Sequence, residues 1–157
     1  MPHKPLRKKN TPADKLLRVM AFGTFDLVHA GHLDFFRQAR ALAKHVFLIV
    51  SLARDANVLR IKGRLPSHSE SYRLKQIKKI PGVDKAVLGG KRAYFFHIRQ
   101  QRPDVIALGY DQRDYVRELR RDLKQAGMRT RVVRLRPFRP NVYKTSLLRQ
   151  NVVKYLK

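Results

Sequence analysis

The sequence predicts a single α/β domain built on a parallel, doubly wound β-sheet. Short apolar runs typical of strands alternate with stretches whose apolar residues recur at helical steps of three and four. The 157 residues suffice for one ordinary hydrophobic core, and the chain shows no internal repeat. Parallel strands joined by helices wind in right-handed crossovers, which would place helices on both faces of the sheet.

The first third of the chain predicts two strands and the helix between them. Apolar runs at 16–22 and 46–50 predict the strands, and the second run is continuous, as expected of a strand buried on both faces. Apolar positions between 33 and 43 predict the helix. The stretch 51–65 loses periodicity and becomes cationic, so we interpret it as a surface loop.

The next elements are a helix, a short strand and a further helix. Ser67, with Glu70 three residues later, fits a capping box that would open the first of these helices. A Pro-Gly pair would end it. A short strand is expected at 85–88, and Tyr94 would begin the apolar face of the following helix. We expect His97 on that helix to be structural or solvated.

The last third of the chain repeats this pattern. The apolar run 105–108 predicts the fourth strand, and 115–123 predicts a helix closed by Gly127. The alternating stretch 131–135 predicts a fifth, outer strand. A closing helix is expected from apolar residues spaced over 148–155.

The charge of the chain is its unusual property. It has 36 Lys and Arg against 11 Asp and Glu, a formal net charge of +25. Such a field attracts polyanions, which include nucleotides, nucleic acid and anionic membrane surfaces. Residues 1–15 are basic and poor in apolar side chains, which indicates a flexible tail before a domain spanning 16–157.

The composition also excludes several classes. With no cysteine, the chain has no disulfide, thiol chemistry or cysteine-bound metal, and a cytoplasmic location is the default expectation. No apolar run approaches the roughly 18–20 residues that span a membrane. The basic first residues also lack the apolar segment of a signal peptide.

The stretch 21–32, Ala-Phe-Gly-Thr-Phe-Asp-Leu-Val-His-Ala-Gly-His, joins the first strand to the first helix. A helix N-terminus offers free backbone N–H groups and the positive end of a dipole, which suit a phosphate. Gly23 and Gly31 would let the backbone approach a ligand closely. His29 and His32, three apart, would project to one side and stabilise charge on a transferred phosphoryl group. The alternatives are solvated histidines or a metal pair, but zinc would need further ligands, and no third histidine is near.

Residues 23–26, Gly-Thr-Phe-Asp, followed by 29–32, His-Ala-Gly-His, resemble the signature of the cytidylyltransferase-like nucleotidyltransferases. These enzymes join a nucleoside triphosphate to an acceptor phosphate and release pyrophosphate. The resemblance covers roughly 19–149. Within it, 60–64 and 108–112 look most like the archaeal-type FAD synthases, which adenylylate FMN. The bacterial glycerol-3-phosphate cytidylyltransferases are similar through the same blocks.

The resemblance implies a Rossmann-like sheet of strand order 3-2-1-4-5, of the type that carries this His-x-Gly-His signature. In that order strands 1 and 4 are neighbours where the winding reverses, and ligands bind beyond the carboxyl ends of strands at such a switch point. Gly23 and Gly109 stand at the ends of those two strands. Both glycines therefore indicate one pocket in a nucleotidyltransferase domain at 16–157.

The resemblance also assigns residues to roles. The implied catalytic residues are His29, His32, Lys62 and Arg73. The implied nucleotide-binding residues are Thr24, Phe25, His29, Ala30, Gly31, His32, Gly109, Asp111, Thr145 and Ser146, with Arg149 beside the last two. In this scheme the histidines hold the α-phosphate, the two cations grip the phosphates, Thr24 and Phe25 offer backbone groups, and Asp111 meets the ribose or base.

Simpler interpretations stay open for some of these residues. A lone helical arginine such as Arg73 is often only solvated, and Thr145 with Ser146 would also cap a helix. The family usually shows Ile-Ser-Thr-Thr or Ile-Ser-Ser-Ser before its last helix. This chain has Tyr-Lys-Thr-Ser at 143–146, with Lys144 in place of the first hydroxyl. That difference adds a phosphate contact or indicates a different acceptor.

The expected substrates are ATP and an acceptor phosphate, with FMN favoured. Mg²⁺ is expected on the triphosphate rather than in a protein metal site. A second hypothesis is a cytidylyltransferase that uses CTP and glycerol 3-phosphate or a similar small phosphate. A third, from another class, is a basic RNA-binding protein on this scaffold. The basic surface of the chain also suits contact with nucleic acid. Dimers are common in the family that the sequence resembles, so a homodimer is a further expectation.

Overall fold

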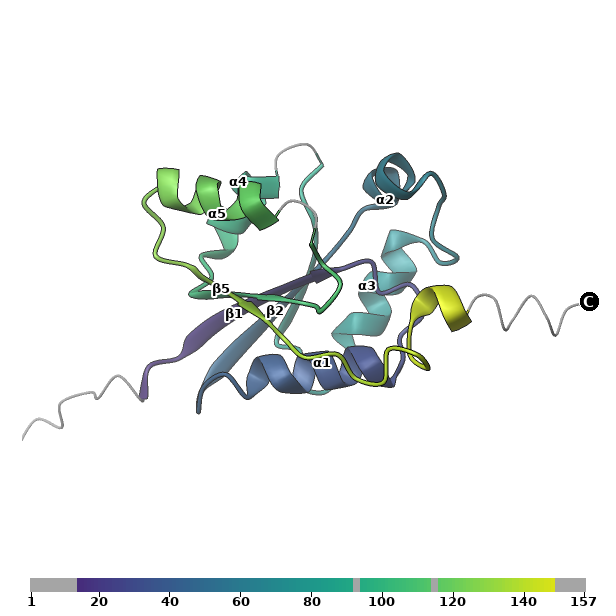
Figure 1. Cartoon of the computed structure of the whole chain (residues 1–157), viewed down its shortest axis with the longest axis horizontal. Coiled ribbons are helices and arrows are strands. Elements are labelled where there is room, and N and C mark those ends of the chain that lie inside the picture. Colours follow the sequence, from purple (N-terminus) through teal and green to yellow (C-terminus); the bar gives the residue numbers. More distant parts are fainter. Residues whose placement is uncertain (1–13, 92–93, 114–115, 149–157) are drawn as a thin grey trace, which may run out of the picture.

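The computed structural model describes residues 14–91, 94–113 and 116–148, and these form a three-layer α/β domain (Figure 1). The sheet has five strands in the order β3-β2-β1-β4-β5, and every neighbouring pair is parallel. The strands are β1 Leu17–Gly23, β2 Val46–Leu52, β3 Lys85–Leu88, β4 Val105–Leu108 and β5 Arg131–Arg134. The predicted fold class and strand order are confirmed.

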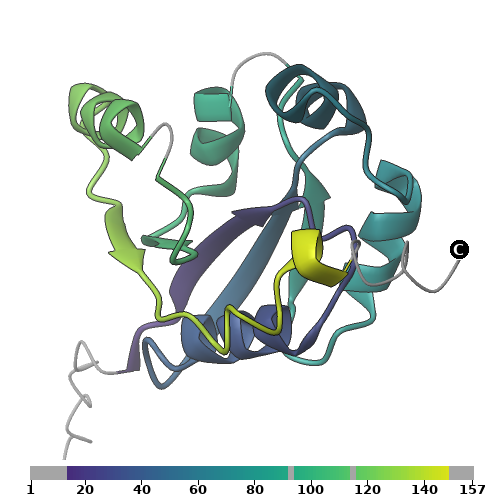
Figure 2. The ribbon, with the colours of Figure 1, turned by 45° about the vertical axis from the view of Figure 1, so that its right-hand side comes forward.

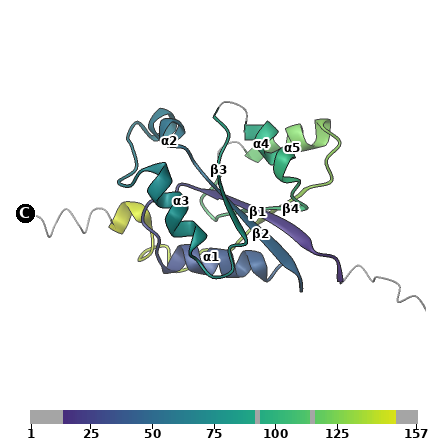
Figure 3. The same cartoon turned by 180° about the vertical axis from the view of Figure 1, so that it is seen from behind.

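Helices cover both faces of the sheet. The described residues form the helices α1 Ala30–Arg40, α2 Asp55–Lys62, α3 Glu70–Lys78, α4 Tyr94–Gln101 and α5 Val116–Gln125. One face packs against α1 and α3, and the other against α4 and α5 (Figures 1 and 3). Phe36 and Ile77 belong to the first core, Ile98 and Leu119 to the second. The sheet is therefore doubly wound, as its parallel strands require.

The long strands β1 and β2 lie at the centre and end level with each other. They pair in register from Leu17 with Val46 to Gly23 with Leu52. Around their carboxyl ends gather the N-terminus of α1, helix α2 and a helical turn at 145–148 (Figure 2). Ligands of open parallel sheets bind at this edge.

The stretch expected to be a surface loop contains helix α2 instead. This helix buries only Val58, because it lies beyond the sheet edge and not on a sheet face. Without a buried face its sequence needs no apolar period, which explains why the pattern of 51–65 indicated a loop. Gly63 ends the helix in the left-handed conformation, with φ 69°.

The expected cap of α3 was also wrong by two residues. Ser69, not Ser67, is the N-cap, and its side chain accepts a hydrogen bond from the Tyr72 N–H. The Ser67 N–H instead donates to the carboxylate of Asp26 at 2.8 Å. That long-range bond fixes Ser67 outside the helix, which a local sequence pattern cannot indicate.

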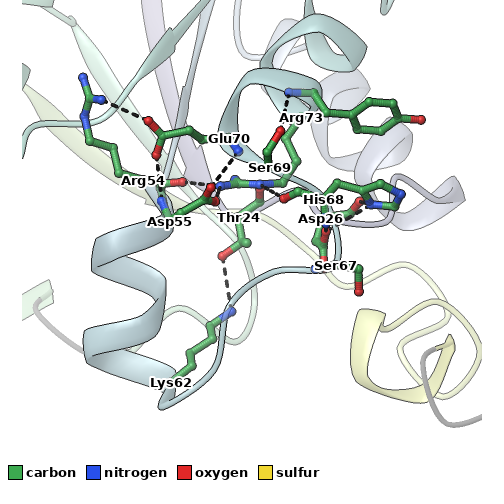
Figure 4. A network of polar contacts seen from close by, with 12 residues as sticks. Thr24, Asp26, Arg54, Asp55, Lys62, Ser67, His68, Ser69, Glu70 and Arg73 are labelled. Carbon is green, nitrogen blue, oxygen red and sulfur yellow. Dashed lines mark hydrogen bonds and ion pairs between the residues drawn. The ribbon is translucent and has the colours of Figure 1, made fainter.

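Helices α2 and α3 begin side by side and cap each other (Figure 4). The Asp55 N–H donates to the Glu70 carboxylate at 2.8 Å, and the Glu70 N–H donates back to the Asp55 carboxylate at 3.0 Å. Each carboxylate also lies at the positive end of a helix dipole. This reciprocal pair joins the two helices into one unit next to β1.

Of two expectations for α4, the one for Tyr94 is wrong and the one for His97 is confirmed. Tyr94 is exposed, and its hydroxyl donates to Asp122 at 2.6 Å, so it lies outside the apolar face. His97 is buried and pairs with the Ser51 hydroxyl at 2.9 Å, which makes it structural. Residues 1–13, Tyr115 and 149–157 lie outside the described residues, and with them Arg149 and most of the stretch expected to form a closing helix.

Residues 135–148, called the C-terminal segment below, return from the sheet edge across α1 (Figures 1 and 2). The side-chain amide of Gln38 on α1 holds this segment in place through two hydrogen bonds. Its nitrogen donates to the Arg136 carbonyl and its oxygen accepts from the Arg136 N–H, both at 3.0 Å. The segment thereby reaches the carboxyl edge of β1.

Replacing Gly23 by alanine should destabilise the fold. An alanine Cβ would lie 2.6 Å from the tip of the Phe25 ring, which is itself buried. Because the ring must move, we expect the free energy of unfolding in urea to fall by about 1–3 kcal/mol. Gly127→Asn is the control, because its site is open and asparagine tolerates a φ of +65°. Equal stability of Gly23→Ala and the parent would contradict this packing.

Candidate active site

His29 and His32 form a stacked histidine pair at the start of α1. Their ring centres are 3.8 Å apart with planes 20° apart. His29 is the N-cap, and its Nδ1 accepts a hydrogen bond from the Gly31 N–H at 3.1 Å. The proton of neutral His29 is therefore on Nε2, which is left to face a ligand. The Gly31 amide, expected to be free for a phosphate, already has a partner.

His32 lies deeper than His29. Its ring packs between His29 and the edge of Phe25, at 5.1 Å and 77°. Its Nδ1 is buried and, among the described residues, has no hydrogen-bond partner. Burial, followed by the charge of His29, lowers the pKa of His32 to about 3. Burial also lowers the pKa of His29, so both rings are neutral at pH 7 without a ligand.

Phe25 acts as a wedge under the histidine pair. Its φ of 50° is left-handed, a conformation that costs energy for a residue with a bulky side chain. The ring covers Gly23 and packs between His32 and Phe36, whose ring centre is 5.2 Å away. The strained backbone thus places an aromatic support beneath His32.

Asp26, the last residue of the Gly-Thr-Phe-Asp signature, fixes the loop before α3. It is buried, and its carboxylate accepts hydrogen bonds from the backbone N–H groups of Ser67 and His68, at 2.8 and 2.9 Å (Figure 4). No separate role was predicted for this acid, because Ser67 and His68 lie about forty positions away along the chain.

Lys62 and Thr24 meet at the end of β1. The Lys62 ammonium donates to the Thr24 hydroxyl at 3.3 Å from the last turn of α2 (Figure 4). Lys62 is exposed, so its ammonium group can leave this weak contact and form a stronger one with an anion. The structure therefore brings these two predicted site residues together.

Arg73 lies next to Thr24, and all three of its guanidinium nitrogens donate hydrogen bonds within the protein (Figure 4). Only 1% of its surface is exposed. It donates to the carbonyls of Thr24, Ala53 and His68 at 2.6, 2.9 and 3.1 Å. It also pairs with the Asp55 carboxylate at 2.6 Å. This placement favours a positioning role at the ends of β1 and β2 over the phosphate contact expected from the resemblance.

The loop after β4 is tied to the same edge. The Gln112 amide accepts from the Gly109 N–H at 2.7 Å and donates to the Phe22 carbonyl at 2.9 Å. Gly109 and the exposed Asp111 are thereby held next to β1, as the switch-point argument predicts. The sequence indicated the loop but not the bridging role of Gln112.

The C-terminal segment reaches the histidine pair through Tyr143. The Tyr143 ring stacks on His29 at 6.1 Å and 22°. Thr145 and Ser146 follow directly in the helical turn, and Lys144 is exposed. The aromatic contact was not predicted, since nothing local in the sequence links residue 143 to residue 29.

The donors gathered at this edge suit an anion. They are the His29 Nε2–H, the Lys62 ammonium and the Thr24 hydroxyl, next to the positive end of α1. The described part of the chain contains no group of three or more His, Asp or Glu side chains arranged to hold a metal ion. The donors at this edge therefore fit a phosphate ligand.

A family model described as Cytidylyltransferase-like matches residues 20–151. The chain belongs to this family. An FAD synthase of Methanosarcina mazei is 42% identical over 126 residues, which cover 80% of both chains. An FAD synthase of Thermoplasma acidophilum is 34% identical over 141 residues, covering 90% of this chain and 97% of that one.

A solved structure has the same fold. It is the lipopolysaccharide core biosynthesis protein from Thermoplasma volcanium GSS1, which is 34% identical with a TM-score of 0.72. The match covers 78% of this chain and 98% of that one. Within the described ranges, no helix is both long and apolar enough to cross a membrane.

The histidine pair should make folding stability depend on pH. The unfolded His32 takes up a proton near pH 6.5, but the folded one only near pH 3. The unfolded state therefore binds more protons below pH 6.5, and stability falls as the pH drops from 6.5 toward 3. This contribution approaches about 1.4 kcal/mol per pH unit. Urea unfolding between pH 7 and 4.5 measures it.

His32→Gln should flatten this pH dependence, because glutamine has no proton to gain. His45→Gln, which changes an exposed histidine outside the site, is the control and should keep the parent slope. An identical slope in His32→Gln and the parent would show that His32 is not held neutral by the fold.

Proposed function

We propose that this protein is an FAD synthase, which transfers the adenylyl group of ATP to FMN. The observation that carries the proposal is that relatives named FAD synthase are 34–45% identical over most of the chain. In the reaction an FMN phosphate oxygen bonds to the α-phosphorus of ATP. The bond from that phosphorus to the β-phosphate oxygen breaks, and pyrophosphate leaves. One P–O bond forms and one breaks, so the reaction needs no nucleophile from the protein.

The protein would act by positioning and by stabilising charge. We assign the α-phosphate to the His29 Nε2–H and to His32. Both rings are neutral without ligand, and a bound polyanion raises their pKa, so their positive charge grows where negative charge accumulates. Lys62 would leave the Thr24 hydroxyl and follow the departing pyrophosphate as a mobile point charge.

The remaining predicted site residues would bind or position the nucleotide. Thr145 and Ser146 stay predicted phosphate contacts, and Asp111 a predicted contact to the ribose or base. We assign Arg73 to positioning because all of its hydrogen bonds hold the framework of the site. Mg²⁺ would enter on the triphosphate, whose oxygens are the ligands it prefers, and no protein residue is assigned to it.

The excess of positive charge supports this function in a general way. ATP and FMN are both anions, and a net charge of +25 would raise their rate of encounter at low salt. Contact with nucleic acid and formation of a homodimer remain predictions from the sequence. The CTP-dependent reaction is the competing activity, and the choice of triphosphate distinguishes it.

The first test is a product assay. The purified protein is incubated with Mg²⁺, each nucleoside triphosphate, and FMN or glycerol 3-phosphate, and products are separated by chromatography. We expect FAD and pyrophosphate only from ATP and FMN. His32→Ala should lower kcat by about 10²–10³. A CDP-linked product would replace this proposal with the cytidylyltransferase, and no product from any pair would refute it.

Substitution of Lys62 should lower activity, whereas substitution of Arg73 should lower stability. Lys62→Met removes an exposed charge, so we expect kcat/KM for ATP to fall roughly 10- to 100-fold with unchanged unfolding in urea. Arg73→Met removes the ion pair of Asp55 and leaves several carbonyls without their donor, so stability should fall by about 3–5 kcal/mol. Each variant is the control for the other. Low activity with full stability in Arg73→Met would instead indicate direct phosphate contact.

A further inference from the structure

A continuous series of aromatic rings runs from the C-terminal segment into the core beneath the site. Phe138 stacks on Tyr143 at 5.9 Å and 15°, and Tyr143 stacks on His29 at 6.1 Å and 22°. Beyond His29 the series continues through His32, Phe25 and Phe36. The histidine pair is therefore clamped between one aromatic support below and another that arrives from a distant part of the chain.

The backbone of the C-terminal segment is shaped to present Tyr143. Arg139 has a left-handed φ of 43° directly before Pro140, a position where the chain normally prefers extended conformations. Its carbonyl accepts hydrogen bonds from the N–H groups of Val142 and Tyr143, both at 2.9 Å. Such strain persists where the surrounding structure holds it. The result is a tight turn that directs residue 143 toward α1.

Gly31 leaves the space that this contact needs. An alanine Cβ at residue 31 would lie 3.0 Å from the His29 ring and 3.3 Å from the Tyr143 Cβ. The glycine of the His-Ala-Gly-His signature thus lies against both rings. Its N–H also fixes the His29 Nδ1. Gly31 and Tyr143 together leave His29 little freedom to turn.

We propose that Tyr143 is a positioning residue that acts through His29. Its ring fixes the plane of the imidazole, so that the Nε2–H stays directed at the reacting phosphate. Its π-face also attracts the positive charge that His29 gains when an anion binds. This inference rests on the proposed function for the identity of that anion. It assigns to the C-terminal segment a role in orienting the N-terminal signature.

The test compares two substitutions of Tyr143 with a matched control. Tyr143→Leu removes the ring, whereas Tyr143→Phe keeps it and removes only the hydroxyl. Tyr72→Leu is the control, because Tyr72 also stacks on a histidine, His68, at 4.6 Å and 18°, outside the histidine pair. Ring-proton NMR of His29, assigned with His29→Gln, reports the stacking without any substrate.

We expect Tyr143→Leu to lower kcat about 10- to 100-fold, the usual effect of a misplaced catalytic group, with a small change in KM for ATP. The His29 resonance should move downfield, and its pKa with ATP bound should fall, because the ring no longer supports the charge. Tyr143→Phe should match the parent in kcat, in the His29 resonance and in the pKa of His29 with ATP bound. Tyr72→Leu should move the His68 resonance and leave kcat and His29 unchanged.

The outcomes separate this proposal from the proposed function. An unchanged kcat and His29 resonance in Tyr143→Leu would overturn the role of Tyr143. A loss of kcat with an unmoved His29 resonance would also overturn it, since the effect would then bypass the imidazole. The parent could fail to form FAD while Tyr143→Leu still shifts the His29 resonance and lowers its pKa. That result would refute FMN as the acceptor and support the positioning role of Tyr143. Should Tyr143→Leu unfold, Phe138→Leu, which removes the supporting ring, should shift His29 in the same direction.

Discussion

The buried guanidinium of Arg73 is the interaction on which the site depends. Burying a charge is costly unless it is paired and hydrogen-bonded. Here all three guanidinium nitrogens donate, to the carbonyls of Thr24, Ala53 and His68 and to the carboxylate of Asp55. These acceptors end β1 and β2, begin α2 and precede α3. One side chain thus joins four segments, and the position of Thr24, to which Lys62 reaches, follows from it.

The same arrangement explains which groups remain for a ligand. A helix N-terminus usually offers backbone amides to a phosphate. In this protein the amides of Gly31, Gly109 and Ser67 are occupied by His29, Gln112 and Asp26 respectively. The protein therefore uses its backbone to orient side chains, and the side chains of His29 and Lys62 face the ligand. Catalysis would then depend on how firmly these side chains are held.

The sequence predicted what local patterns control, and failed where distant residues decide. The strands, their order and the signature at 23–32 follow from apolar runs, glycines and the family resemblance. Helix α2 was missed because it has no buried face to impose a period. The cap of α3 was misplaced because Asp26 holds Ser67 from outside. The burial of Arg73 and the contact of Tyr143 with His29 depend on tertiary neighbours that no local pattern reveals.

The neutral histidines connect this framework to the chemistry. Burial lowers the pKa of both rings, so the ligand-free protein holds two polar groups in an unfavourable environment. A phosphate relieves that cost because it supplies both a hydrogen-bond partner and a counter-charge. The aromatic rings on either side of the pair restrict rotation of the imidazoles, which could otherwise turn toward solvent and hydrogen-bond with water. Binding of an anion would therefore recover part of the free energy that burial of the two imidazoles costs.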